Sequence, residues 1–380
     1  MPARQYQLDA VQAIRKACRD NVRSVVCLPT GAGKGYILGD LARSICSKGK
    51  RMLVLAHVAE LVEQNANQCR RNLPPVAPFE LDPVGILSAG LKERSYTAQI
   101  LSAGIQTACR CSTDIGKVDL IICDEAHGIM PGEQSGMYRK FLAEMLVINP
   151  HTWIIGLTAT PYRLKGGPIY GEDPDLLFDS MCYHISVLDL IEQGYLCRLT
   201  SKAPAPAARR DFSELHIRAG EFVAEEVEAI TCEDSYVRDG VADMLSKSKD
   251  RHSILIFCSS VAHAEKVVIE IQSQCECGHG PNEPADEYAK KVECNCVELI
   301  TGETPQTIRA SIIASFKAGS LRFLVNVSVL TTGFDAPNVD CVAIFRPTIS
   351  PGLFYQCCGR NFRLHLDSDK IYQKFIEIVD

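Results

Sequence analysis

A short glycine-rich turn near the N-terminus has the residue types needed to hold a phosphate. The run Leu28-Pro-Thr-Gly-Ala-Gly-Lys34 follows an apolar strand predicted at 24–28 and precedes an amphipathic helix predicted at 36–46. Glycines let the backbone wrap a phosphate, the N–H groups at a helix start point at its oxygens, and a lysine neutralises its charge. The residues predicted to bind a nucleotide here are Thr30, Gly31, Ala32, Gly33, Lys34 and Gly35.

The residue after the lysine departs from the usual phosphate-binding pattern. Serine or threonine normally stands there and its hydroxyl ligates Mg²⁺, but this chain has Gly35. The metal would then be held by phosphate oxygens, water and carboxylates from elsewhere in the chain. We therefore expect looser metal placement and slower turnover, so that Gly35→Ser should raise kcat; an unchanged or lower rate would contradict this expectation.

A second set of chemically active residues, Asp124-Glu125-Ala126-His127, follows a strand predicted at 120–123. Ligands bind at the carboxyl ends of parallel strands, and two adjacent carboxylates there are costly unless they face a cation. Asp124 is the expected partner of Mg²⁺, generally through water, with Glu125 beside it. Glu125 is also the expected base for the attacking water, and Lys34 the residue that neutralises the β- and γ-phosphates. Together these residues predict a site for Mg²⁺ and ATP.

The elements that must position these residues follow an α/β pattern. Short β-branched runs alternate with longer amphipathic stretches, which is typical of parallel sheets flanked by helices. With 380 residues, the chain is long enough for two domains. We expect the first at 1–197, a connecting segment at 198–236 that contains Ala203-Pro-Ala-Pro-Ala-Ala208, and the second at 237–380.

Composition sets further limits on function. No run of 18 apolar residues is present and the N-terminus lacks the apolar stretch of a signal peptide, so we expect a cytoplasmic protein without membrane contact. Most of the 18 cysteines lie singly in apolar runs, as Cys27 and Cys123 do, where cysteine acts as a small hydrophobe. The net charge of −6 does not exclude nucleic acid, because a locally basic groove is sufficient.

The order of motifs resembles that of superfamily 2 helicases of the DEAD/DEAH-box type, and within them most closely the RadD-type DNA-repair ATPases. This resemblance implies two RecA-like domains with the ATP site in the cleft between them. It also implies that Gln7 bonds the adenine edge while Arg4 or Tyr6 flanks the base. The remaining matching segments are Ala56–Gln64, Ile105–Thr107, Gly156–Pro161, Ile254–Ser260, Val329–Pro337 and Gln356–Arg363.

The resemblance assigns roles to residues in the second domain. Gly333 and Asp335 would contact the nucleotide, Asp335 by meeting the ribose or relaying the domain interface. Gln356, Arg360 and Arg363 match the last motif, and a helix would place the two arginines on one face because they are three residues apart. Both would act on the γ-phosphate as arginine fingers, an effect of roughly 10³–10⁵ in rate.

The expected substrate is single-stranded or branched DNA, gripped through its phosphates without sequence preference. DNA rather than RNA, a role in repair, recombination or replication, and partners such as single-strand-binding or recombination proteins all rest on the resemblance. Two alternatives stay open. One is a DNA-dependent ATPase that remodels or translocates without separating strands. The other is an ATP-gated clamp with weak hydrolysis, which Gly35 favours and which Glu125, Arg360 and Arg363 oppose.

A cysteine-rich insertion stands between the helix predicted to end near residue 274 and the strand predicted at 297–300. Two Cys-x-Cys pairs there could supply four thiolates to a zinc ion, with His279 as a substitute ligand. A cysteine-rich surface loop without metal is the alternative interpretation. The four candidate zinc ligands are Cys275, Cys277, Cys294 and Cys296.

Overall fold

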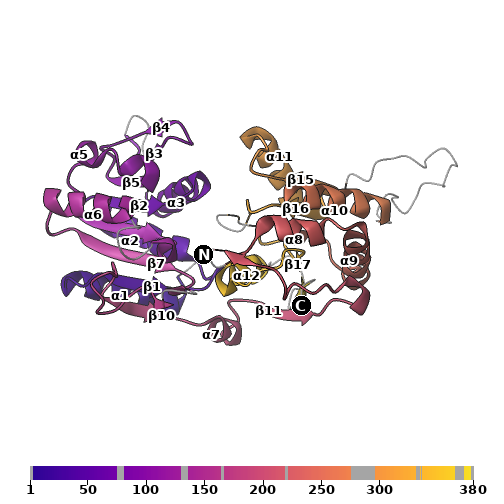
Figure 1. Ribbon diagram of the computed structural model, residues 1–380. Coiled ribbons are helices and arrows are strands. Elements are labelled where there is room, and N and C mark those ends of the chain that lie inside the picture. Colours follow the sequence, from indigo (N-terminus) through magenta and orange to yellow (C-terminus); the bar gives the residue numbers. More distant parts are fainter. Residues whose placement is uncertain are drawn as a thin grey trace. The chain divides into compact units, whose positions relative to one another are not determined.

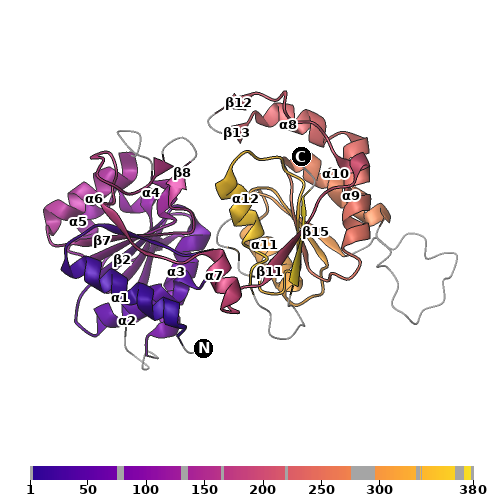
Figure 2. The ribbon, with the colours of Figure 1, turned by 90° about the horizontal axis from the view of Figure 1, so that it is seen from below.

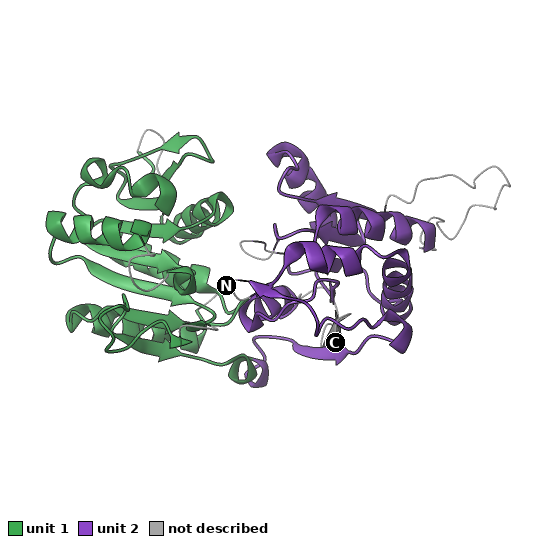
Figure 3. Cartoon of the chain, in the orientation of Figure 1, with its two compact units in different colours: residues 1–190 green, residues 191–380 purple. Residues whose placement is uncertain are grey.

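The computed structural model describes residues 3–74, 81–129, 136–163, 167–218, 221–274, 296–330, 334 and 336–363, together with the backbone of 372–377. The chain forms two compact units, residues 1–190 and 191–380 (Figure 3). Each unit has a sheet of its own, and Figure 1 labels the elements along the chain.

An eight-stranded sheet with the order β10-β1-β7-β6-β2-β5-β3-β4 forms the centre of the first unit. Apart from the antiparallel pair of β3 and β4, its neighbouring strands are parallel. Strands β1, β2, β5 and β6 are buried along their whole length, as parallel strands covered on both faces must be. The strands are β1 (Ser24–Cys27), β2 (Met52–Ala56), β3 (Val84–Ser88), β4 (Glu93–Arg94), β5 (Ile100–Gly104), β6 (Leu120–Asp124), β7 (Trp153–Thr158) and β10 (Ser180–His184).

Helices cover both faces of this sheet (Figure 2). On one face lie α1 (Gln5–Arg19), α2 (Lys34–Cys46) and α3 (Ala59–Asn72); on the other lie α4 (Ile105–Ala108), α5 (Ser112–Ile115) and α6 (Gly136–Ile148). Helix α1 buries Tyr6, Ala10, Ile14 and Ala17, whose spacing of three or four residues makes one apolar stripe. The unit also contains η1 (Ala126–Gly128) and a small hairpin of β8 (Tyr162–Arg163) and β9 (Gly167–Pro168), and α7 (Val187–Glu192) leads into the second unit.

The second unit is built on a six-stranded parallel sheet with the order β11-β18-β17-β14-β16-β15. Side chains of α9 and α10 form one hydrophobic core with strand residues such as Ile254 and Phe323. Its strands are β11 (Arg198–Lys202), β14 (Ile254–Phe257), β15 (Val297–Ile300), β16 (Phe323–Asn326), β17 (Cys341–Ile344) and β18 (Tyr372–Glu377), with the hairpin β12 (Ile217–Arg218) and β13 (Glu221–Phe222). Its helices are η3 (Pro206–Ala208), α8 (Ala224–Thr231), α9 (Asp234–Lys247), α10 (Val261–Gln274), α11 (Gln306–Lys317) and α12 (Pro351–Cys358).

The segment expected as a connection, residues 198–236, has more structure than its alanine and proline content indicates. Strand β11 pairs with β18 at the edge of the second sheet, and Ala208 and Phe212 belong to the core of that unit. The local composition is typical of a linker, but pairing with a strand more than 160 residues later gives the segment its place. No helix among the described residues is long and apolar enough to cross a membrane.

Candidate nucleotide-binding site

The glycine-rich turn connects β1 to α2 as the sequence predicts. Helix α2 begins at Lys34, and Gly33 before it has a left-handed backbone with φ of 83°. Gly31 has a φ of 84°, so two residues of the turn adopt conformations that favour glycine. The turn therefore ends at a helix N-terminus, whose free N–H groups and dipole attract a phosphate.

The N-terminal motif lies against this turn. The hydroxyl of Tyr6 donates to the carbonyl oxygen of Ala32 at 2.6 Å, and Nε2 of Gln7 donates to the same oxygen at 3.2 Å. The Gln7 carboxamide oxygen accepts from the backbone N–H of Arg4 at 3.1 Å, while Nη1 of Arg4 donates to Tyr6 at 3.1 Å. The fold thus brings the motif next to the phosphate-binding turn. The adenine-reading role of Gln7 and Arg4 stays a prediction.

The P-loop lysine and the Asp-Glu-Ala-His motif meet at the carboxyl ends of β1 and β6. Nζ of Lys34 lies 2.8 Å from Oε1 of Glu125, although the two residues are 91 positions apart in the chain. Glu125 has a φ of 48°, a left-handed conformation that is strained for a residue with a Cβ atom. The strain turns the chain sharply after β6 and presents the carboxylate to Lys34.

Asp124 is buried, with 5% of its surface exposed. Burial raises the pKa of its carboxyl, whereas the charge of Lys34 lowers it; the charge of Glu125 raises it, and hydrogen bonds from Asn65 and the Glu125 N–H lower it. Nδ2 of Asn65 donates to Oδ2 of Asp124 at 2.9 Å. Buried carboxylate oxygens beside a lysine suit a hard cation such as Mg²⁺ carried by a polyphosphate. The residues present therefore fit the Mg²⁺ and ATP that the sequence predicts.

Asn65 was not singled out from the sequence. It lies on the buried side of α3, 4% exposed, between apolar residues such as Val62 and Cys69. A polar residue on the apolar stripe of an amphipathic helix is the pattern that could have identified it.

A hydrogen-bond chain connects this site to the next motif. Nδ1 of His127 and Oγ1 of Thr158 are 2.9 Å apart, and Oγ1 of Thr158 also lies 3.1 Å from the carbonyl oxygen of Thr160. Burial lowers the pKa of His127, while the nearby Glu125 raises it. These hydrogen bonds link the end of β6 to the segment Gly156–Pro161 at the end of β7.

Two further motifs of the first unit are joined by hydrogen bonds. Nε2 of Gln106 donates to the carbonyl oxygen of His57 at 2.9 Å, and Thr107 Oγ1 accepts from the N–H of Ala89 at 3.1 Å. The first contact holds the segment after β2 beside the segment after β5, and the second joins the segment after β3 to the segment after β5.

In the second unit, the last motif is only partly helical. Helix α12 contains Gln356 but ends at Cys358, so the expectation that Arg360 and Arg363 share a helical face is wrong. Gly359 and Arg360 instead form a turn, in which Nη1 of Arg360 donates to the carbonyl oxygen of Phe334 at 2.5 Å. Burial lowers the pKa of Arg363 to about 10, so its guanidinium keeps its charge at neutral pH.

Several expected site residues lie outside the described residues. They are Gly333 and Asp335, the cysteines Cys275, Cys277 and Cys294, and His279. Cys296, the remaining candidate zinc ligand, is half-buried just before β15. Among the described residues, no group of three or more histidine, cysteine or acidic side chains is arranged to hold a metal ion.

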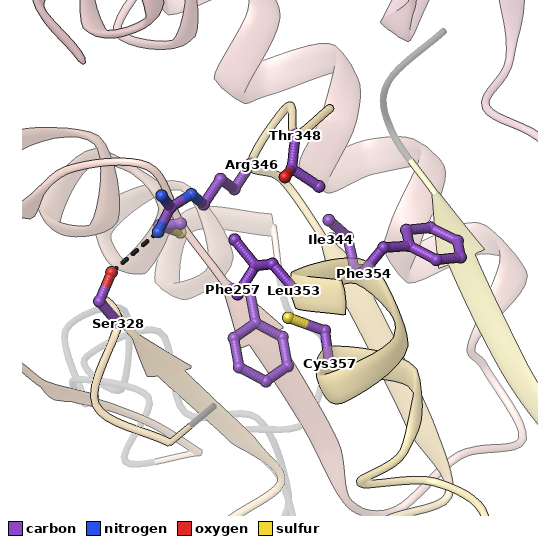
Figure 4. Close-up of a pocket in the computed structure, with 9 residues that line it drawn as sticks. Phe257, Ser328, Ile344, Arg346, Thr348, Leu353, Phe354 and Cys357 are labelled. Carbon is purple, nitrogen blue, oxygen red and sulfur yellow. Dashed lines mark hydrogen bonds between the residues drawn. The ribbon is translucent and has the colours of Figure 1, made fainter. Parts of the chain in front are cut away.

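A small pocket of the second unit lies between α12 and the ends of β14 and β17 (Figure 4). Phe257, Leu353 and Cys357 give it an apolar floor. At its rim, Nη1 of Arg346 donates to Oγ of Ser328 at 2.8 Å. Arg346 follows directly on a buried strand run, so this cation stands at the carboxyl edge of the sheet, where sequence reading had assigned no residue.

The first unit is thus a RecA-like P-loop fold, defined by a parallel sheet with a P-loop after β1 and an acidic pair after β6. Residues 1–163 match the family model for the res subunit of type III restriction enzymes, and residues 237–365 match the model for the helicase conserved C-terminal domain. The chain belongs to the superfamily 2 helicases of the DEAD/DEAH type, a class of nucleic-acid-dependent ATP hydrolases, and it forms their two-unit core.

Known proteins resemble the chain over nearly its whole length. IRC3 of Saccharomyces cerevisiae, named as an ATP-dependent helicase, is 26% identical in an alignment 380 positions long. The alignment covers 96% of this chain and 50% of IRC3. A solved fragment from Vibrio vulnificus, described as an HsdR subunit of a type I restriction enzyme, aligns with a TM-score of 0.69 at 21% identity over 98% of this chain and 63% of that one. The helicase Lhr of Mycobacterium smegmatis, bound to ssDNA and AMP-PNP, aligns with a TM-score of 0.63 at 16% identity over 97% and 45%.

The chain corresponds to only part of each of these relatives. The chain spans about half the length of IRC3. Solved structures that share its fold include one bound to DNA and another bound to RNA. The fold therefore does not distinguish between the two nucleic acids.

Proposed function

We propose that this chain hydrolyses ATP when it is bound to single-stranded or branched DNA and acts as a helicase or translocase core. The observation that carries the proposal is the 2.8 Å contact of Lys34 with Glu125 beside the buried Asp124. A lysine that can exchange a carboxylate for a phosphate, next to a base, is the arrangement needed for phosphoryl transfer to water.

The side chains of the first unit divide this work. Lys34 leaves Glu125 and neutralises the phosphates, which frees the Glu125 carboxylate to orient a water molecule and accept its proton. Asp124, held by Asn65, keeps its carboxylate directed at the end of β6 and would hold the Mg²⁺ that carries the phosphates. His127 and Thr158 pass the resulting shift to the segment after β7.

Arg360 and Arg363 are proposed as the arginine fingers of the second unit. Arg360 is bound to the Phe334 carbonyl here, so it would have to exchange this contact for a phosphate oxygen. Arg360→Lys keeps the charge but loses the planar fork of donors. We therefore include it beside the Glu125 variant described below and expect a loss of kcat with little change in ATP affinity.

The experiment that tests this function is DNA-stimulated phosphate release by the wild type and by Glu125→Gln. The amide keeps the shape of Glu125 but cannot accept the proton, so we expect a loss of about 10²- to 10⁴-fold in kcat. Glu172→Gln, an exposed glutamate of the same unit, is the matched control and should behave as wild type. Stimulated release that survives in Glu125→Gln would contradict the assigned base.

The preference for DNA is tested with strands of equal length. The DNA assignment, like a role in repair, recombination or replication and partners such as single-strand-binding proteins, is supported by the resemblance to RadD-type ATPases. We expect single-stranded or branched DNA to stimulate phosphate release more than RNA does. A larger stimulation by RNA would overturn the DNA assignment.

Two alternative functions can be distinguished by experiment. The first alternative is a motor that moves on DNA without separating strands, and a strand-displacement assay beside the ATPase assay distinguishes it from a helicase. Gly35 favours an ATP-gated clamp, for which ATP would strengthen DNA binding without measurable phosphate release.

The cytoplasmic location stays a prediction that cell fractionation can test.

A further inference from the structure

Helices α2 and α3 approach each other closely along a pair of glycines. Gly35 and Gly39 lie one turn apart on α2, and a Cβ atom added to either would overlap a side chain of α3. The overlapping partner is Gln68 for Gly35 and Asn72 for Gly39. The glycines therefore make room for two carboxamides that are themselves one turn apart.

The carboxamide of Gln68 occupies the space of the side chain that the P-loop lacks. A Cβ at Gly35 would stand 2.7 Å from Cδ and 2.8 Å from Oε1 of Gln68, closer than real Cβ contacts. The serine or threonine usual at this position would need that same volume. Gln68 is half-buried, and its carboxamide makes no hydrogen bond to the part of the chain that the structure describes.

The same helix reaches the acidic half of the site. Asn65 precedes Gln68 by three residues, which places the two carboxamides on one face of α3. Asn65 is bound to Asp124 at 2.9 Å, so this face lies along the edge where the P-loop and the end of β6 meet. A carboxamide oxygen is a hard ligand that can bind Mg²⁺ directly or accept a hydrogen bond from one of its water molecules.

We propose that Gln68 replaces the missing P-loop hydroxyl and offers its carboxamide oxygen to the metal ion of bound Mg·ATP, directly or through a water molecule. This inference rests on the ATP-binding function proposed above and names a positioning residue for it. Asn72 fills the corresponding space at Gly39 one turn further from the P-loop, and its Nδ2 donates to the backbone carbonyl oxygen of Gln68 at 3.1 Å, so its role is structural.

Gly35→Ser has two effects if Gln68 positions the metal ion. A serine at this position adds a hydroxyl but also displaces Gln68, so the two effects oppose each other in the single variant. The pair Gly35→Ser with Gln68→Ala removes the overlap and leaves the hydroxyl as the oxygen donor.

The test is binding of a fluorescent, non-hydrolysed ATP analogue to the ligand-free full chain, titrated with Mg²⁺ and repeated in EDTA. Gln68→Met keeps the length of the side chain without the oxygen, Gln68→Glu keeps an oxygen, and Asn72→Ala is the matched control. Loss of a metal-positioning contact costs about 10- to 100-fold in metal affinity. We therefore expect Gln68→Met to need at least 10-fold more Mg²⁺ for half-maximal binding, with unchanged binding in EDTA.

The other variants should require nearly the same Mg²⁺ concentration as the wild type. Gln68→Glu, Asn72→Ala and the Gly35→Ser/Gln68→Ala pair should all stay within about threefold of wild type, since each has an oxygen at the P-loop. Thermal unfolding without ligand checks that each variant is folded, and Gln68→Ala serves in place of Gln68→Met if the latter is not.

Two results would overturn the inference. In the first, Gln68→Met and Asn72→Ala require the same Mg²⁺ concentration; in the second, Gln68→Met weakens binding equally in EDTA. Both would make Gln68 a packing residue while ATP binding stands. A wild-type chain that binds no nucleotide at any Mg²⁺ concentration would instead overturn the proposed function, and this inference with it.

Discussion

At the scale of single residues, burial sets the protonation of side chains that sequence reading treats alike. His127 and His263 both follow apolar strands by a few residues, yet they lie in different units and have different neighbours. His127 faces Glu125 and Thr158. His263 is fully buried between the rings of Tyr236 and Phe345, with centroids at 5.9 and 6.2 Å.

His263 provides a pH-dependent contribution to stability. Its Nδ1 lies 2.9 Å from Oγ of Ser259, its Nε2 has no hydrogen-bond partner among the described residues, and burial lowers its pKa to about 3. In the unfolded state this histidine has a pKa near about 6.5, so it is protonated at a higher pH than in the folded state. The free energy of unfolding therefore decreases as the pH falls from about 6.5 towards 3. We expect this histidine to account for about 2 kcal/mol of stability lost between pH 7 and pH 5.

Urea unfolding of His263→Phe at the two pH values measures this effect. The phenylalanine keeps a ring between Tyr236 and Phe345 but cannot be protonated. The difference in stability between pH 7 and pH 5 should shrink by about 2 kcal/mol in this variant, whatever its absolute stability. The exposed His252→Asn is the control, and an equal pH dependence in wild type and His263→Phe would contradict the assignment.

At the scale of elements, the close contact between α2 and α3 depends on Gly39. A Cβ there would stand 2.6 Å from Cβ of Asn72, so both helix backbones must shift to accept it. Overpacking of this kind costs about 1–3 kcal/mol, more than the helix propensity gained on replacing glycine with alanine.

We therefore expect Gly39→Ala to lower the free energy of unfolding and Asn72→Gly to restore most of it in the double variant. Asn72 is the last residue of α3, where a glycine costs little. Thermal or urea unfolding measures both effects. Gly136→Ala at the start of α6, where an added Cβ meets nothing within 4 Å, is the matched control. A Gly39→Ala variant as stable as this control would show that the two helices can separate at no cost.

The local sequence predicts the order of the elements better than it predicts the contacts between them. The apolar runs in the sequence predict β1 and β6, which are buried along their whole length, and β15 in the second unit. Segment 198–202 was missed, since β11 is an exposed edge strand without that pattern. Helix α12 ends before Arg360 because Gly359 and the turn that follows, not the arginine spacing, set its boundary.

At the scale of the whole molecule, the sheet of the second unit pairs a strand from the start of that unit with a strand from its end. Strand β18 stands between β11 and β17, so residues 372–377 pair with residues 198–202 on one side and 341–344 on the other. A chain that ends at residue 363 would leave both partners as unpaired edges, which are prone to aggregation and local unfolding.

Truncation tests this arrangement. In the chain that ends at residue 363, we expect faster proteolysis within residues 191–363 and unchanged resistance of residues 1–190, read by mass spectrometry of the fragments. A chain that ends at residue 377 keeps β18 and should be as resistant as the full chain. Equal resistance of the second unit in the two truncated chains would mean that β18 does not support β11.

The sequence by itself determined the class of protein and the local chemistry, because glycine turns, helix starts and adjacent carboxylates act over a few residues. It predicted the P-loop at Gly31–Lys34, the acidic pair at Asp124 and Glu125, and two α/β units around them. Only the tertiary structure decided which side chains from other elements complete the site. Asn65 on Asp124 and Gln68 over Gly35 are contacts between helices and strands whose packing fixes the distances, and no local pattern encodes them.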